Sequence, residues 1–356
     1  MANVLNDSKK IKELDKSDML GLLLGLDEQY RRAKDIGLAF DTSIISGDGV
    51  RNIVFTGLGG SAIGADVIRS YTAEEIKVPI MVNRSYTLPN FVNENTLLFV
   101  SSYSGDTEET LSAYKIAKEK RARMIAISSN GMLEKLAKGD GVPFIDIPGE
   151  LPPRCALAYS FIPPMLILSR LGFIANKEKE VDETAEILKG LKNELEPGRP
   201  TEANIAKRIA LKLVHRFPII YGASDHVDVV ITRWRGELAE NSKHLASSHV
   251  FPEMNHNEIV GWDFPIELMG QFVVIFLRDR EDHERVARRM DITKDILSQK
   301  GISIIELFSR GEGLLSRMTS LIYIGDMVSF YLAILNGVDP MPVNRITYLK
   351  KALKKF

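Results

Sequence analysis

The sequence has a single cysteine, Cys155, among its 356 residues. One thiol excludes an internal disulfide and a cysteine-rich metal cluster, and it suits the reducing conditions of the cytosol. Net charge is also nearly absent, because 46 Lys and Arg residues oppose 47 Asp and Glu residues. This balance argues against nucleic acid or an anionic membrane as the main partner. We therefore expect a protein with neither nucleic-acid nor membrane partners.

Long apolar runs are missing as well. None reaches the ~18 residues that a membrane span requires, and residues 1–7 lack the apolar core of a signal peptide. A hydrophobic content of 45% with 26% charged residues is typical of a soluble globular protein with a sizeable core. The sequence predicts a cytoplasmic protein with room for two domains.

Apolar runs alternate with segments of helical periodicity. After an N-terminal helical segment at about 18–37, strands are predicted at 52–56, 78–82, 97–100, 124–127 and 144–147, with helices near 62–72, 107–119 and 131–138. The pattern restarts with strands at 217–222, 247–251, 272–276 and 302–306, and helices near 226–242, 282–299 and 314–335. Such alternation predicts α/β domains, each with a parallel sheet covered by helices on both faces.

The expected fold is therefore two doubly wound, flavodoxin-like domains with helical N- and C-terminal segments. We place the N-terminal helices and the first domain at 1–176, and a helix with its linker at 177–200. The second domain is expected at 201–338 and a C-terminal helix at 339–356. Ligands of doubly wound domains bind at the carboxyl ends of the strands.

One such strand end carries an unusual number of hydroxyls. Residues 101–107 read Ser-Ser-Tyr-Ser-Gly-Asp-Thr and join a buried strand to an amphipathic helix. The N-terminus of a helix attracts anions, and Ser102, Ser104 and Thr107 add hydroxyl donors there. The loop has no basic residue and no Walker pattern, so a small phosphomonoester fits better than a nucleoside triphosphate. The alternative is that these hydroxyls only cap the helix.

A second loop of small residues follows the first strand. The run 57–64 contains a partial G-x-G-x-x-G pattern, but its last glycine is displaced and no acidic residue stands where a ribose would need one. NAD binding is therefore disfavoured. The turn at Gly59, Gly60 and Ser61 instead lets backbone approach a ligand closely and supplies one further hydroxyl.

Together the two loops resemble the SIS, or sugar isomerase, domain. In that domain a Gly-Gly-Ser turn follows the first strand, and Ser-x-Ser-Gly-x-Thr-x-Glu-Thr follows a later one. The resemblance implies that a sugar phosphate is held by five residues of this chain: Gly60, Ser61, Ser102, Ser104 and Thr107.

Segments 152–154, 233–243 and 251–262 extend the likeness. With them, most of residues 50–350 resembles the bifunctional phosphoglucose/phosphomannose isomerase family, a cofactor-free branch of the phosphoglucose isomerases. The family's Asn-Glu-Asn-Ala-Lys is Ala-Glu-Asn-Ser-Lys at 239–243, which keeps the carboxylate. The resemblance implies interconversion of glucose 6-phosphate, and of mannose 6-phosphate, with fructose 6-phosphate through a cis-enediol.

The same resemblance assigns catalytic roles. Glu240 is expected to move the proton between C1 and C2, since one carboxylate suffices for both transfers. Arg154 supplies a permanent positive charge for the enediolate. His256 is expected to open the sugar ring, with Asn255 and Asn257 on either side able to fix its orientation. It is also expected to reach the cleft of a second subunit in a homodimer, where Trp262 can pack against the partner. A C-terminal lysine returns to the site, and Lys350 is the matching position, with Lys351 adjoining it.

Three alternatives remain to be weighed. His244, His249 and His256 raise the question of a metal, but their spacing is not that of a helical metal motif and no thiols accompany them, so none is expected. A non-catalytic sugar-phosphate sensor would keep the hydroxyl loops without needing Glu240, Arg154 and His256 together. A glutamine-dependent aminotransferase would need a glutaminase domain, for which no residues are left.

Overall fold

The computed structural model describes residues 2–353. The chain divides into two compact units: unit 1 comprises Met1–Leu24, Leu188–Gly311 and Arg317–Phe356, and unit 2 comprises Gly25–Ile187 and Glu312–Ser316. The division falls inside helices α9 (Glu178–Leu195) and α14 (Leu314–Leu335). Each unit has its own parallel sheet.

The sheet of unit 2 has five strands in the order β2-β1-β3-β4-β5, and every neighbouring pair is parallel. Its central strands are buried along most of their length, as the continuous apolar runs predict. The strands are β1 (Asn52–Thr56), β2 (Ile80–Asn83), β3 (Thr96–Ser101), β4 (Arg123–Ser128) and β5 (Phe144–Asp146). This order is the doubly wound, flavodoxin-like one, which confirms the predicted fold class.

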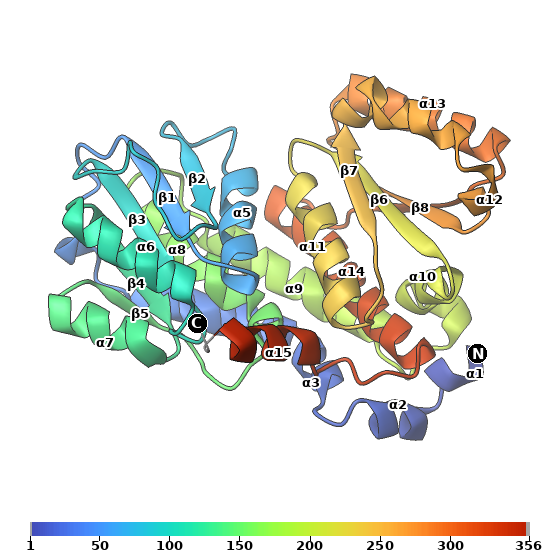
Figure 1. Ribbon diagram of the computed structural model, residues 1–356, viewed down its shortest axis with the longest axis horizontal. Coiled ribbons are helices and arrows are strands. Elements are labelled where there is room, and N and C mark those ends of the chain that lie inside the picture. Colours follow the sequence, from blue (N-terminus) through green and yellow to red (C-terminus); the bar gives the residue numbers. More distant parts are fainter. Residues whose placement is uncertain (1, 354–356) are drawn as a thin grey trace. The chain divides into compact units, whose positions relative to one another are not determined.

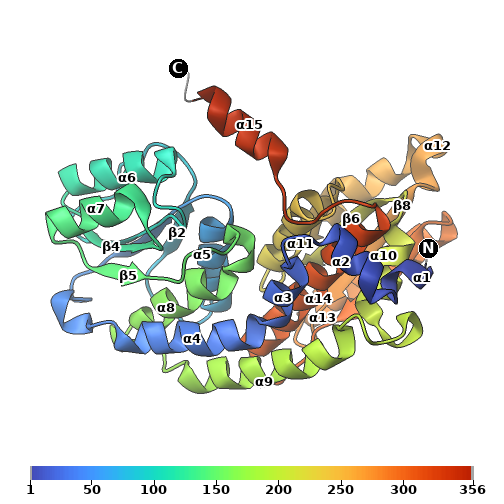
Figure 2. The same cartoon turned by 90° about the horizontal axis from the view of Figure 1, so that it is seen from below.

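Helices cover both faces of this sheet (Figure 1). One face buries its apolar side chains against α6 (Glu108–Glu119) and α7 (Gly131–Asp140). The other is covered by α5 (Gly60–Tyr71) and α8 (Leu157–Arg170), and α4 (Leu26–Ala39) packs along α8, as Figure 2 shows from below. Gly37 permits this close helix packing, because a Cβ there would lie 3.0 Å from the Cα of Pro163.

The sheet of unit 1 has four parallel strands in the order β7-β6-β8-β9. They are β6 (Phe217–Ala223), β7 (Ser247–Phe251), β8 (Phe272–Arg278) and β9 (Ser303–Phe308). Helix α13 (Glu284–Gln299) and two 3₁₀ helices, η4 (Glu253–His256) and η5 (Glu258–Asp263), pack on one face. Helix α11 (Asp228–Glu240) packs against β6 and β7. All four strands predicted for the second domain are confirmed.

The remaining helices are short or lie at the ends of the chain. The predicted helical segment at 18–37 is interrupted at Gly25, which separates α3 from α4, because glycine is a poor residue for a helix interior. The others are α1 (Ala2–Leu5), α2 (Ser8–Leu14), α3 (Met19–Leu24), η1 (Thr42–Ile44), η2 (Pro153–Cys155), η3 (Thr201–Ala203), α10 (Ile205–Leu213), α12 (Ile266–Met269) and α15 (Asn344–Leu353).

Helix α14 is the one element of residues 2–353 that is long and apolar enough to cross a membrane. Its apolar window is 94% buried within the structure, which is the environment of a core helix. Arg317 and Asp326 lie within α14, and both side chains are engaged in buried ion pairs. Charged side chains are rarely buried unless they are paired, and both of these are paired.

Candidate active site

The two hydroxyl-bearing loops of unit 2 meet at the point where the sheet changes direction. β1 and β3 are neighbours; the chain leaves β1 through α5 toward β2 on one side, and leaves β3 through α6 toward β4 on the other. Ligands of doubly wound sheets bind at this switch point. The N-termini of α5 and α6 begin there, so two helix dipoles favour a negative charge at the same edge of the sheet.

Thr107 stands at the N-cap position of α6, yet its side chain makes no capping hydrogen bond. Its hydroxyl instead accepts a hydrogen bond from the hydroxyl of Ser102, with an O–O distance of 2.9 Å. Ser102 is only 1% exposed. Thr107 therefore does not cap the helix with its side chain. The buried hydroxyl of Ser102 instead orients the hydroxyl of Thr107.

Ser104 is exposed at the tip of the same loop, and its hydroxyl accepts a hydrogen bond of 3.4 Å from the backbone N–H of Asp106. The next residue, Gly105, has φ of +70°, and a Cβ there would lie 1.8 Å from the carbonyl oxygen of Asn130. Gly131 meets Ser104 in the same way, with its Cβ position 2.4 Å from the Ser104 carbonyl oxygen. Backbone therefore packs on backbone here, and this contact fixes the loop that presents Ser104.

Ser61, in the first turn of α5, links the two loops. Its Oγ accepts a 3.2 Å hydrogen bond from the backbone N–H of Tyr103. Because that bond uses an oxygen lone pair, the hydroxyl hydrogen of Ser61 can serve another acceptor, such as a phosphate oxygen.

Arg154 lies against this corner of unit 2. A Cβ at Gly60 would be 2.5 Å from the carbonyl oxygen of Pro153 and 3.3 Å from the backbone nitrogen of Arg154. Only glycine allows so close an approach between the start of α5 and η2. Arg154 is 5% exposed, so unit 2 buries a permanent cation beside its hydroxyl loops. A guanidinium and two helix N-termini together suit an anionic ligand.

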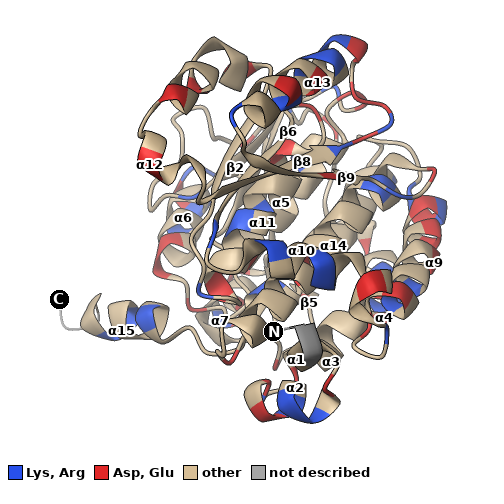
Figure 3. Cartoon of the chain, turned by 90° about the vertical axis from the view of Figure 1, so that its right-hand side faces the viewer, with Lys and Arg blue, Asp and Glu red and all other residues tan. Residues whose placement is uncertain are grey.

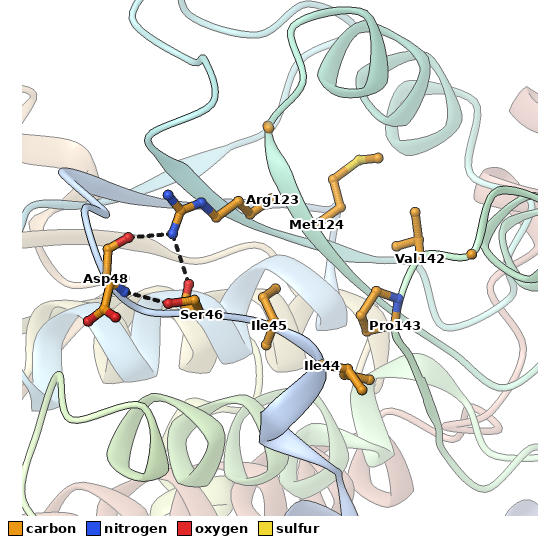
Figure 4. A pocket seen from close by; sticks show the side chains of 10 residues that line it. Ile44, Ile45, Ser46, Asp48, Arg123, Met124, Val142 and Pro143 are labelled. Carbon is orange, nitrogen blue, oxygen red and sulfur yellow. Dashed lines mark hydrogen bonds between the residues drawn. The ribbon is translucent and has the colours of Figure 1, made fainter.

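A cavity of about 390 Å³ lies at the opposite edge of this sheet, beside the starts of β4 and β5 (Figure 4). The guanidinium of Arg123, which lines it, donates to the carbonyl oxygens of Ser46, Asp48 and Glu94. These backbone acceptors engage that positive charge, and the hydroxyl loops lie at the other ends of the strands. The geometry gives this cavity no part in phosphate binding.

Glu240 is the last residue of α11 in unit 1 and is half-buried. The buried face of the same helix carries a polar network. Arg233 pairs with Glu237 at 3.1 Å, and Glu237 accepts a 2.9 Å hydrogen bond from the side-chain amide of Asn241. This network fixes the end of the helix on which Glu240 stands.

His256 ends η4 and is exposed; no hydrogen bond within residues 2–353 involves its ring. Its neighbours Asn255 and Asn257 were expected to orient it, but their side-chain amides bond elsewhere. The amide of Asn255 donates to Thr293 at 3.0 Å, and that of Asn257 donates to Glu253 at 2.9 Å. Both amides serve the local fold.

His244 and His249 each have a local partner. The Nε2 of His244 lies 2.6 Å from the carbonyl oxygen of Arg216, and the Nδ1 of His249 accepts the N–H of Val250 at 2.8 Å. Among the residues described, no group of three or more His, Cys, Asp or Glu side chains is placed to hold a metal ion.

Trp262 is part of the core of unit 1. Its indole N–H donates to the hydroxyl of Tyr221 at 3.1 Å, its ring packs edge-on against Phe272, and it is 5% exposed. The Tyr221 hydroxyl in turn donates to Glu258. Trp262 was expected to face a partner subunit, and its burial in its own chain argues against that role. The exposed apolar residues nearby are Val260, Phe264, Ile266 and Leu268.

Lys350 and Lys351 occupy the last turn of α15, which has no buried residue. Figure 3 shows basic residues, in blue, on this helix. Both side chains are exposed. Cations at the end of a helix complement its dipole, and this local role applies to either lysine.

The structure thus brings six of the nine predicted residues together within unit 2: Gly60, Ser61, Ser102, Ser104, Thr107 and Arg154. Glu240, His256 and Lys350 belong to unit 1. Sequence reasoning missed Tyr103, whose backbone joins the two loops. It fills the variable position between two serines, so no sequence signal marks it.

A doubly wound sheet with hydroxyl loops at its switch point is the arrangement expected of an SIS domain, and the comparisons with known proteins identify that domain here. The SIS domain family matches residues 49–138, and the bacterial phospho-glucose isomerase C-terminal SIS domain matches residues 202–353. A Thermus thermophilus protein described only as hypothetical superposes with a TM-score of 0.74 at 16% identity, covering 98% of this chain and 93% of its own. That likeness supports the fold.

Similarity to curated proteins is higher. The bifunctional phosphoglucose/phosphomannose isomerase of Caldicellulosiruptor bescii is 45% identical over 338 residues, which cover 95% of this chain and 99% of that protein. The Aquifex aeolicus protein of the same name is 35% identical over 93% of this chain and 99% of its own. The chain belongs to the bifunctional phosphoglucose/phosphomannose isomerase family.

Proposed function

We propose that this protein is an aldose–ketose isomerase that interconverts glucose 6-phosphate and mannose 6-phosphate with fructose 6-phosphate. The observation that carries the proposal is the 45% identity to a relative of that name over nearly the whole of both chains. We assign the reaction to glycolysis and gluconeogenesis, and the protein to the cytoplasm.

The phosphate of the substrate is proposed to bind at the start of α5 and α6. Ser61, Ser104 and Thr107 would donate hydroxyl hydrogens to it, together with backbone N–H groups of the two first turns. Ser102 is too buried for direct contact and would act by orienting Thr107. Gly60 would bring the α5 backbone close to the ligand.

The proton transfer is assigned to Glu240. Isomerisation removes a proton from the carbon beside the carbonyl and returns it to the neighbouring carbon, through a cis-enediol(ate). One carboxylate on a single face of that intermediate can perform both transfers. The negative charge that develops on the enediolate oxygens requires a cation, and the guanidinium of Arg154 supplies one.

Ring opening is assigned to His256, because an imidazole can both donate and accept the proton that passes to and from the ring oxygen. Exposure of its ring in the single chain supports the proposal that it serves the site of a second subunit in a homodimer. Lys350, or Lys351 next to it, is proposed to complete the site. With each step assigned to a side chain, the reaction as proposed needs no metal and no cofactor.

The rival hypothesis is a non-catalytic sugar-phosphate sensor. A coupled assay of the purified protein on glucose 6-phosphate and on mannose 6-phosphate, with and without EDTA, separates the two. We expect turnover of both aldose phosphates that survives chelation. Binding without turnover would favour the sensor, and activity that EDTA removes and zinc restores would move the histidines into a metal site.

A further inference from the structure

Tyr103 joins the phosphate loop to the segment that carries Arg154. Its hydroxyl donates to the carbonyl oxygen of Pro148 at 2.8 Å and accepts the backbone N–H of Leu151, also at 2.8 Å. Both partners lie between β5 and η2, in the segment 148–151 that runs toward Arg154. One phenol thus bridges the two ends of this segment.

The segment depends on that phenol. Within residues 2–353, the two bonds to Tyr103 are the only hydrogen bonds that residues 148–151 make. Glu150 at its centre has φ of +68°, a conformation that non-glycine residues seldom adopt without support from their surroundings. Gly149 and Glu150 are exposed, so burial does little to hold them.

The other side of Tyr103 is firmly held. Its backbone N–H donates to Ser61, and its carbonyl oxygen accepts bonds from the N–H and the hydroxyl of Ser129 at 3.2 and 2.7 Å. Burial raises the pKa of the phenol above its ordinary value, which keeps its hydrogen in place for Pro148. The backbone of Tyr103 belongs to the phosphate site, and its side chain reaches the segment before Arg154.

We infer that Tyr103 is a positioning residue for Arg154: its phenol holds the segment 148–151 in the conformation that places the guanidinium for the reaction. This role rests on the proposed isomerase activity. Phosphate bound at Ser61 and Thr107 fixes the backbone of Tyr103. The phenol of Tyr103 then fixes the segment 148–151, which leads to Arg154. Binding of the phosphate and alignment of the cation are thereby linked.

The test is Tyr103→Phe, which keeps the ring and removes both hydrogen bonds. We expect kcat for fructose 6-phosphate formation to fall by about 10- to 100-fold, the scale on which misplacement of a catalytic group acts. KM, and the inhibition constant of inorganic phosphate, should change by less than about threefold, since the backbone contacts of the loop remain.

The matched control is Tyr114→Phe. Tyr114 is a buried tyrosine of the same unit whose hydroxyl donates to Asp140 at 2.9 Å, away from the segment. It should lose a similar amount of thermal stability while kcat stays within about twofold. An equal loss of kcat in both variants would show that the effect of Tyr103 is general destabilisation.

A double-mutant cycle with Arg154→Lys tests the route of the effect. Lysine keeps the charge and lacks the planar fork of arginine. If Tyr103 acts through the guanidinium, Tyr103→Phe should cost less than about twofold in the Arg154→Lys background. The same loss in both backgrounds would overturn the positioning role.

Proteolysis supplies a readout that needs no activity. A glutamate-specific protease should cut after Glu150 faster in Tyr103→Phe than in wild-type or Tyr114→Phe protein, and an unchanged rate would overturn the claim that the phenol holds the segment. Wild-type protein that isomerises neither aldose phosphate would refute the proposed function itself. Active wild-type protein with a fully active Tyr103→Phe variant would refute only the role of Tyr103.

Discussion

Arg233 and Asp326 form a two-pronged ion pair between helices α11 and α14 in the interior of unit 1. The Nε of Arg233 lies 3.1 Å from one carboxylate oxygen of Asp326, and its Nη2 lies 2.8 Å from the other. Glu237 shares the same guanidinium at 3.1 Å, and all three side chains are buried. One cation thus serves two buried carboxylates, and burial raises the pKa of Asp326.

Loss of Arg233 should therefore be the most costly change in this network. Arg233→Met leaves Asp326 and Glu237 buried without their cation, which should lower the free energy of unfolding by ~3–5 kcal/mol. Asp326→Asn should cost less, since Glu237 still pairs with the arginine. Urea unfolding followed by tryptophan fluorescence measures this, because both tryptophans, Trp234 and Trp262, lie in unit 1.

The control for that series is Arg310→Met, which breaks the exposed Arg310–Glu194 pair of the same unit. Exposed pairs contribute ~1 kcal/mol or less. Equal destabilisation by Arg233→Met and Arg310→Met would contradict the importance given to the buried pair.

Asp282 should weaken the fold at neutral pH. Burial, together with repulsion from Asp279, raises its pKa to about 6 from an ordinary 3.8. The folded state therefore holds this proton more tightly than the unfolded state, so the contribution of Asp282 to stability is most favourable below about pH 4 and becomes less favourable as the pH rises through about 6. Asp282→Asn removes this half-buried charge and should stabilise unit 1 by ~1–2 kcal/mol at pH 7.5, with solvent screening taken into account.

Unfolding of the Asp282→Asn variant at pH 7.5 and at pH 4 tests both the size and the sign of this effect. The gain should shrink toward zero at the lower pH. Asp295→Asn, at an exposed position of α13, is the control and should be neutral at both values. A gain for Asp282→Asn that is the same at both pH values would rule out titration of this group as its cause.

Replacement of Glu240 should separate catalysis from binding. Glu240→Gln removes the proposed base, so kcat should fall by at least ~10²-fold. Inhibition by inorganic phosphate should stay within a few-fold of wild type, because the hydroxyl loops are untouched. Thr232→Ala, on the exposed face of the same helix, should keep full activity. Near-wild-type turnover by Glu240→Gln would show that the carboxylate of Glu240 is not the base.

The hydroxyls of the α6 loop should carry phosphate affinity. Each hydrogen bond to a charged group contributes roughly 1.5–3 kcal/mol, so Ser104→Ala combined with Thr107→Ala should raise the inhibition constant of inorganic phosphate by at least ~10²-fold. Ser129→Ala, which loses a hydroxyl bond to the carbonyl oxygen of Tyr103, controls for loop stability. Unchanged phosphate affinity in the double variant would show that these hydroxyls serve only the local structure of the loop.

Subunit mixing tests whether His256 serves a neighbouring chain. Glu240→Gln and His256→Ala proteins should each be inactive alone, and activity should return when their subunits exchange, because one site of the mixed dimer then receives both intact residues. Labelled subunits establish that exchange has occurred. Exchange without recovered activity would mean that each chain uses its own histidine.

The strands and the loop chemistry could be predicted because both are local. A buried parallel strand is a continuous apolar run, and the residues that follow it mark the edge where ligands bind. The switch point also follows from the order of the strands, so the positions of Ser61 and Thr107 needed no knowledge of their contacts.

Contacts between distant residues were beyond prediction. The hydrogen bond from Tyr103 to Pro148 joins residues 45 positions apart in the sequence, and no local sequence feature of either residue indicates it. For the same reason the sequence could not show that the indole of Trp262 bonds to the hydroxyl of Tyr221 in the core of unit 1. The sequence alone suggested a subunit interface for Trp262 instead. The burial of Ser102 likewise depends on the packing around it, which the motif does not describe.

The backbone contacts of Gly105 and Gly131 restrict how this enzyme can be re-engineered. Neither position has room for a methyl group against the opposite backbone. The loop before α6, with Gly105, and the loop before α7, with Gly131, therefore behave as one rigid piece. A library that randomises the substrate-facing side chains should keep both glycines and the lengths of both loops. The exposed tip of the α6 loop carries Ser104, so such a library should also keep that hydroxyl together with those of Ser61 and Thr107.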